Sequence, residues 1–152
     1  MKIRKILIKI SLLGAMLLIP PAMMVQAQFK YTTINNAVSI MGYTGFGGAV
    51  IIPGAINGLP VTSIVGEAFY RCTNLTSIVI GTNVTSIGAR AFSECPSLIS
   101  VTIPNSVTNI GGAAFSECPN LKAVTIPKSV SNIGNEKFTW GTNLTSVTNP
   151  LR

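Results

Sequence analysis

The chain has 152 residues, of which 10% are charged and 7% aromatic, and its formal net charge is +7. It contains no histidine and no aspartate, which excludes Ser-His-Asp and Cys-His nucleophile arrangements and most zinc and non-haem iron sites. Abundant Val, Ile, Thr, Asn and Gly instead favour short strands joined by turns. We therefore expect a non-catalytic protein with no cofactor and no metal.

The segment over residues 1–27 is typical of a secretory signal peptide. Residues 1–9 carry four basic side chains and no acid, residues 10–19 are apolar, and the small residues before position 28 suit a cleavage site. The apolar run is shorter than the about 20 residues of a transmembrane helix, although a retained N-terminal anchor is the alternative. Cleavage near Ala27 predicts a mature chain of 125 residues (152 minus 27) that is secreted or held at the cell surface.

Removal of this segment lowers the net charge of the chain. The mature chain keeps seven basic and four acidic side chains, a net charge of +3. Nucleic-acid binding needs Lys and Arg clustered on one face, so we expect no nucleic-acid partner. No second long apolar segment follows the predicted cleavage site, and we expect no membrane span in the mature chain.

Residues 28–58 are expected to form an N-terminal cap and the entry to the first coil. Residues 31–34 and 37–41 are strand-like and flank an Asn-Asn pair. Asn tolerates left-handed geometry, which predicts a β-hairpin. The step from Pro53 to Gly81 is longer than the later repeat, and the extra residues are expected in a bulging loop over residues 54–59.

Residues 59–152 repeat with a fixed period of about 23 residues, the sign of stacked structural units, and the last coil is incomplete. Three of the columns are Phe69, Phe92, Phe115 and Phe138; Ile64, Ile87, Ile110 and Ile133; and Leu75, Leu98, Leu121 and Leu144. Each unit reads L-x-x-[IV]-x-I-P-x-x-V-x-x-I-G-x-x-A-F-x-x-C-x-x. Its first half alternates as a half-buried strand does, Pro or Gly ends that strand, and Ala-Phe fills the interior beneath a short helical or irregular turn. One unit cannot bury its apolar face alone, whereas stacked units bury it jointly.

This pattern resembles the leucine-rich repeat superfamily, and specifically its BspA-like bacterial branch. The resemblance is carried by residues 98–115 and 121–138, and by the lead-in over residues 40–64. It implies a mainly β, right-handed solenoid with short helical turns and a hairpin cap. It also implies adhesion to a host or neighbouring-cell surface or matrix protein, although a fold does not fix a function.

Solenoids commonly bind partners through an extended strand-rich face. The strand positions expected to face outward are Ser77, Val79, Ser100, Thr102, Ala123 and Thr125, and we predict these as the partner-contact residues. The alternative is a structural spacer, or a remnant of a longer surface protein with no ligand of its own. Lys137 and Trp140 break their columns, and this is compatible with either an atypical terminal unit or a truncated array.

Two further columns contain chemically notable side chains. Glu94 and Glu117 are equivalent in neighbouring units, with Arg71 one unit earlier. They could form a glycosidase-like carboxylate pair, since such pairs lie about 5 to 9.5 Å apart, but a solvated column partly neutralised by Arg71 is favoured. Cys72, Cys95 and Cys118 share the other column, and we expect buried thiols, because stacked side chains do not suit disulfide torsions; one disulfide with one thiol left over is the alternative.

Overall fold

The computed structural model describes residues 28–133 and 146–148 of the chain. The predicted signal peptide, Lys137, Trp140 and most of the last predicted coil lie outside these residues. The described residues form strands and no helix. The strands are β1 (Phe29–Ile34), β2 (Ala37–Tyr43), β3 (Gly48–Ile51), β4 (Ala55–Ile56), β5 (Leu59–Ile64), β6 (Leu75–Val79), β7 (Ser86–Ile87), β8 (Ser100–Thr102), β9 (Asn109–Ile110), β10 (Ala123–Thr125), β11 (Asn132–Ile133) and β12 (Ser146–Thr148).

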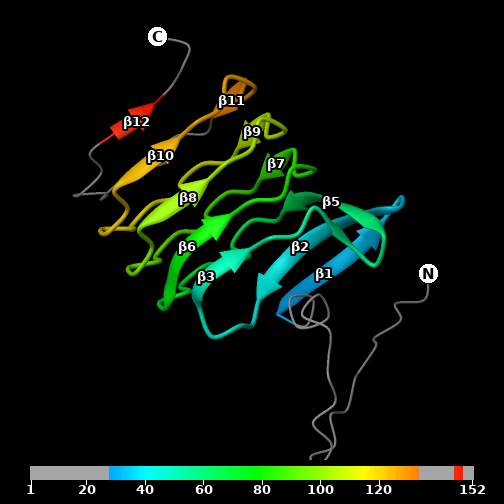
Figure 1. Cartoon of the computed structure of the whole chain (residues 1–152), viewed down its shortest axis with the longest axis horizontal. Helices are drawn as coiled ribbons and strands as arrows, with labels where there is room; N and C mark the ends of the chain where they lie inside the picture. The colour runs from blue at the N-terminus through cyan, green and yellow to red at the C-terminus, as the bar shows by residue number, and fades with distance from the viewer. Residues whose placement is uncertain (1–27, 134–145, 149–152) are drawn as a thin grey trace, which may run out of the picture.

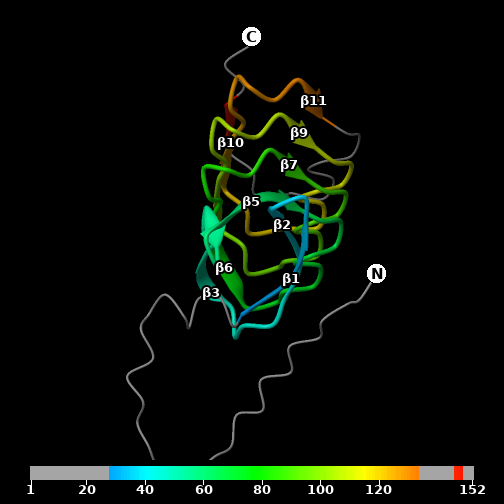
Figure 2. The same ribbon diagram turned by 90° about the vertical axis from the view of Figure 1, so that its right-hand side faces the viewer.

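The strands form two sheets on opposite sides of a stack of coils (Figures 1 and 2). One sheet has five strands in the order β12-β10-β8-β6-β3, and its neighbouring strands are parallel. The other sheet has seven strands and follows the path β1-β2-β5-β7-β9-β11, with β4 paired beside β5. Each coil passes once through each sheet, which confirms the predicted solenoid. The short strands β7, β9 and β11 of the second sheet were not predicted from the sequence.

The predicted N-terminal hairpin is confirmed. β1 and β2 pair antiparallel, and the two turn residues between them, Asn35 and Asn36, have φ values of 50° and 58°. Positive φ at both central positions is the requirement of a type I′ turn, whose twist matches that of the flanking strands. β2 then pairs parallel with β5, so the hairpin continues the second sheet and covers the first coil.

The extra residues at positions 54–59 do not form the expected bulging loop. They form a second hairpin, in which Ala55 pairs with Pro60 and Ile56 with Leu59. Its turn is Asn57-Gly58, with φ values of 52° and 78°, and Asn-Gly is a strong hairpin signal. The insertion is therefore a tight hairpin whose Ile56 is buried.

Among the described residues the corners of the coils are irregular turns, one of the two forms predicted from the sequence, and not the short helical turns that the family resemblance implied. Consecutive i→i+3 hydrogen bonds form there, as from the Tyr70 N–H to the Glu67 carbonyl at 3.0 Å and from the Cys72 N–H to the Phe69 carbonyl at 3.2 Å. Two residues in the first corner are left-handed, Glu67 with φ 63° and Arg71 with φ 58°. Non-glycine residues adopt this conformation singly and not in helices, so a corner cannot extend into a helix.

The core lies between the two sheets and is built from the repeated columns. The rings of Tyr43, Phe69, Phe92 and Phe115 stack along the solenoid, with successive centroids 5.2, 4.9 and 5.4 Å apart. Tyr43 comes from the hairpin cap, so the cap closes the N-terminal end of the aromatic column. The other buried columns include Leu75, Leu98 and Leu121; Ile78, Val101 and Val124; Ile80, Ile103 and Ile126; and Val84, Val107 and Val130.

Candidate functional site

The six predicted contact residues occupy matching positions on three neighbouring strands of the five-stranded sheet. Ser77, Ser100 and Ala123 pair in register across β6, β8 and β10, and so do Val79, Thr102 and Thr125. Buried Ile78, Val101 and Val124 separate the two rows. Because side chains alternate between the faces of a strand, the two rows belong to one face of the sheet, opposite the face that the buried residues line.

The same face extends to strand β3, which the sequence prediction left out. Ala49 pairs with Ser77, and Ile51 pairs with Val79. The sequence signal that could have found them is Val50-Ile51-Ile52-Pro53, which matches the [IV]-x-I-P step of the later repeats. We define the outer face as Ala49, Ile51, Ser77, Val79, Ser100, Thr102, Ala123 and Thr125.

The outer face carries no charged side chain, and its polarity changes along the solenoid. Ile51 is 63% exposed and Val79 is 43% exposed, so large apolar side chains meet solvent at the N-terminal end. Thr102 and Thr125 are exposed in the same row on the next two strands. The face is thus an uncharged surface that is apolar at one end and rich in hydroxyl groups towards the other.

The predicted carboxylate column is organised around an ion pair. The Arg71 Nε donates to Glu94 Oε2 at 2.6 Å, and the Tyr70 hydroxyl donates to Glu94 Oε1. These bonds from Arg71 and then Tyr70 hold the pKa of the Glu94 carboxyl below its usual range. A general acid needs a pKa raised towards the working pH, and Glu94 is shifted in the opposite direction.

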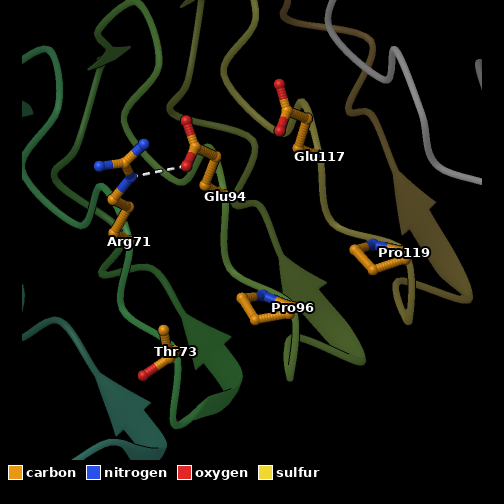
Figure 3. Close-up of a pocket in the computed structure, with 6 residues that line it drawn as sticks. All are labelled: Arg71, Thr73, Glu94, Pro96, Glu117 and Pro119. Carbon is orange, nitrogen blue, oxygen red and sulfur yellow. Dashed lines mark hydrogen bonds and ion pairs between the residues drawn. The ribbon is translucent and has the colours of Figure 1, made fainter.

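Glu117 lies one coil beyond Glu94, at the equivalent corner (Figure 3). Its side chain is exposed. Glu67 and Arg90 form a second ion pair, with Arg90 Nη1 and Glu67 Oε1 3.9 Å apart and both side chains exposed. Such a pair contributes about 0–1 kcal/mol. The described residues contain no group of three or more potential metal ligands.

The three cysteines are free thiols, and two of them are fully buried. The Cys95 thiol donates to the Phe69 carbonyl at 3.1 Å, and the Cys118 thiol donates to the Phe92 carbonyl at the same distance. Hydrogen bonding with the Cys118 thiol and burial raise the pKa of Cys95. The prediction of buried thiols is confirmed for these two, whereas Cys72 is only partly buried.

Comparisons with known proteins agree with the repeat pattern. A model of the BspA type leucine-rich repeat region matches residues 60–151, in 6 copies. No match is found among curated proteins. Within the described part of the chain, no helix has the length and apolar character needed to span a membrane.

Solved leucine-rich repeat structures are similar to this chain. One from Bacteroides capillosus is 30% identical, with a TM-score of 0.72, and the match covers 79% of this chain and 92% of that one. One from T. pallidum is 30% identical, with a TM-score of 0.68 and coverage of 82% and 70%. A leucine-rich cell surface protein from Faecalibacterium prausnitzii is 28% identical, with a TM-score of 0.62 and coverage of 80% and 41%.

Proposed function

Because the chain belongs to the BspA-type leucine-rich repeat family, we propose that it is a non-catalytic protein-binding module, secreted or displayed at the cell surface. In this proposal the signal peptide is cleaved near Ala27, and the mature chain adheres to a surface or matrix protein of a host or neighbouring cell. The similar F. prausnitzii structure is that of a cell surface protein, which supports the location.

The observation that carries the proposal is the outer face. Ile51 and Val79 expose apolar surface on a sheet face without charges. Contiguous exposed apolar surface is typical of protein interaction sites, and depletion of charge is typical of the centre of an interface. Parallel strands fixed by their neighbours also present this surface with little conformational freedom to lose, which lowers the cost of binding.

The charged corners support a binding role over a catalytic one. Glu94 is held in its ionised form by Arg71, and an ionised carboxylate of lowered pKa is a poor proton donor. Glu94 therefore does not supply the carboxylic acid of raised pKa that donates a proton in glycoside hydrolysis. Turnover of a glycan by the protein that disappears in Glu94→Gln would contradict this part of the proposal.

Binding is tested with the exported protein and a panel of immobilised extracellular-matrix and cell-surface proteins. We expect saturable binding to at least one member of the panel. The Asn105→Arg variant serves as a folding and charge control, because Asn105 is exposed on a loop outside the outer face. Absence of saturable binding across the panel would favour the alternative, a structural spacer with no ligand of its own.

A further inference from the structure

A groove runs along the corners of the coils and shares no residue with the outer face. Its larger part has a volume of about 720 Å³ and is lined by Arg71, Thr73, Glu94, Pro96, Glu117 and Pro119 (Figure 3). A smaller depression of about 290 Å³ adjoins it, sharing Arg71 and Thr73 and adding Tyr43, Phe46 and Asn74. We call the two together the corner groove. It crosses from the N-terminal cap over three successive coils.

An aromatic ring is held in solvent at the N-terminal end of this groove. Phe46 is fully exposed, and it lies in a glycine-rich loop fixed to the next coil. The Gly48 N–H donates to the Asn74 carbonyl at 2.7 Å. Gly47 has a φ of 94°, and a Cβ there would lie 2.5 Å from the same carbonyl oxygen. The close approach of loop and coil therefore places Phe46 beside the groove.

The polar groups of the groove are already arranged. Arg71 donates through Nε to Glu94 and lies over the Tyr70 ring, 4.9 Å from its centroid. A guanidinium has five N–H donors, and among the described residues only the Nε group of Arg71 has a hydrogen-bond partner. Each carboxylate oxygen of Glu94 can accept a further bond. The pair is thus neutral as a unit and still offers adjacent donors and acceptors.

The backbone at this column is left-handed at three non-glycine residues. Arg71, Glu94 and Glu117 have φ values of 58°, 56° and 57°. Glycine adopts this left-handed conformation without the steric cost that a Cβ brings. Glu67, Arg90 and Ala113 have the same conformation at the equivalent positions four residues earlier in each coil, with φ values of 63°, 56° and 54°. The left-handed corners are therefore a property of the repeat, and they place one long polar side chain per coil along the groove.

From these features we propose that the corner groove binds an uncharged oligosaccharide. A pyranose ring has an apolar C–H face and a rim of hydroxyl groups. The C–H face stacks on Phe46, and the hydroxyl groups exchange hydrogen bonds with the Arg71–Glu94 pair and with Thr73. The pyrrolidine rings of Pro96 and Pro119 continue the apolar floor under the next sugars.

The groove suits a sugar better than a peptide segment. It is open and shallow, and its aromatic side chain projects into solvent, whereas an apolar anchor of a protein partner is favoured by an enclosed pocket. Its central charges are paired with each other, and Glu117 adds a negative charge one coil further on. Sulfated or sialylated chains would be repelled at that end of the groove.

The test measures binding of the exported protein to immobilised neutral oligosaccharides of the glucan, mannan and chitin types. Heparin serves as the sulfated arm, and an arginine- and lysine-rich peptide serves as the peptide arm. We expect saturable binding to at least one neutral oligosaccharide, weakened at least tenfold by Phe46→Ala. Glu94→Gln should weaken it as well. Ile51→Ala removes an exposed apolar side chain from the outer face and should leave this binding unchanged.

Three results would overturn the proposal. The first is that no neutral oligosaccharide binds saturably at millimolar concentration. The second is that Phe46→Ala and Ile51→Ala weaken oligosaccharide binding equally. The third is that the only binding sensitive to Phe46→Ala is binding to heparin or to the basic peptide. Because Phe46 is exposed, its replacement should leave the thermal midpoint unchanged. The two binding surfaces share no residue, so failure of protein binding at the outer face would leave this proposal standing.

Discussion

Replacement of Phe92 by Ala tests how the coils are held together. The Phe92 side chain is fully buried, and its ring stacks between Phe69 at 4.9 Å and Phe115 at 5.4 Å. The substitution therefore removes contacts to both neighbouring coils at once. In a solenoid, stability is approximately the sum of the intrinsic terms of each coil and the interfaces between neighbours, so one residue in the middle weakens two interfaces.

The expected cost follows from the buried area. A buried aromatic side chain removes about 150–250 Å² from water, which at about 25 cal/mol per Å² stabilises the fold by about 4–6 kcal/mol. Alanine retains part of this burial, and the cavity that remains adds a further cost. The two effects together agree with the about 3–5 kcal/mol observed for Phe→Ala in protein cores. A domain of this size has a total stability of only about 5–15 kcal/mol.

The matched control is the same substitution at an exposed phenylalanine. Phe46→Ala should change the free energy of unfolding by no more than about 0.5 kcal/mol, as is usual for surface positions. Urea denaturation followed by far-ultraviolet circular dichroism measures both variants. A loss below about 1 kcal/mol in Phe92→Ala, or equal losses in the two variants, would refute the stacked aromatic column as a main source of stability.

Three further predictions concern the backbone, the ion pair and the thiols. Gly88→Ala should destabilise the protein by about 1–3 kcal/mol in the same assay, because the added Cβ would collide with the Gly66 nitrogen of the neighbouring coil. Gly42→Ala should cost less, because the nearest contact of its added Cβ is at 3.6 Å. Equal costs for the two variants would contradict the close approach of the coils. The pKa of Glu94 is lowered by Arg71 and Tyr70, so its contribution to stability is present above the ordinary Glu pKa and is lost as the pH falls through the lower folded-state pKa. Thermal midpoints followed from neutral to acid pH should therefore fall further for the unmodified protein than for Glu94→Gln, and parallel curves would count against the pairing. In native protein, 5,5′-dithiobis(2-nitrobenzoic acid) should react first with Cys72, the partly buried thiol. The two buried thiols, Cys95 and Cys118, should react only after urea is added. One common rate for all three thiols would contradict the burial of Cys95 and Cys118.

The repeat and its consequences could be predicted because they depend on spacing. A fixed period decides which side chains stack, so the phenylalanine column and the rows of the outer face followed from the sequence. The first hairpin was also predictable, since Asn35-Asn36 separates two strand-like segments. The second hairpin carried an equally local signal in Asn57-Gly58, but the segments on either side are short, and they were interpreted as a loop.

Other features depend on packing between coils and leave no local signal. The two-residue strands β7, β9 and β11 pair only because neighbouring coils lie in register. The left-handed conformation of Arg71 and Glu94 is unexpected for residues of these types. The exposure of Phe46 depends on how its loop meets Asn74 in the next coil. The corner groove therefore became visible only in the folded protein, whereas the part of the outer face on β6, β8 and β10 could be placed from sequence.

The central claim is that a protein partner binds the outer face, and a charge placed on that face tests it most directly. Val79→Arg and Thr102→Arg, combined in one variant, introduce two positive charges in the exposed row. Each should keep the fold, because both side chains point to solvent. We predict that the affinity for a protein captured from the surface and matrix panel falls at least tenfold in this variant and stays unchanged in Asn105→Arg. An unchanged affinity in the double variant would contradict the claim.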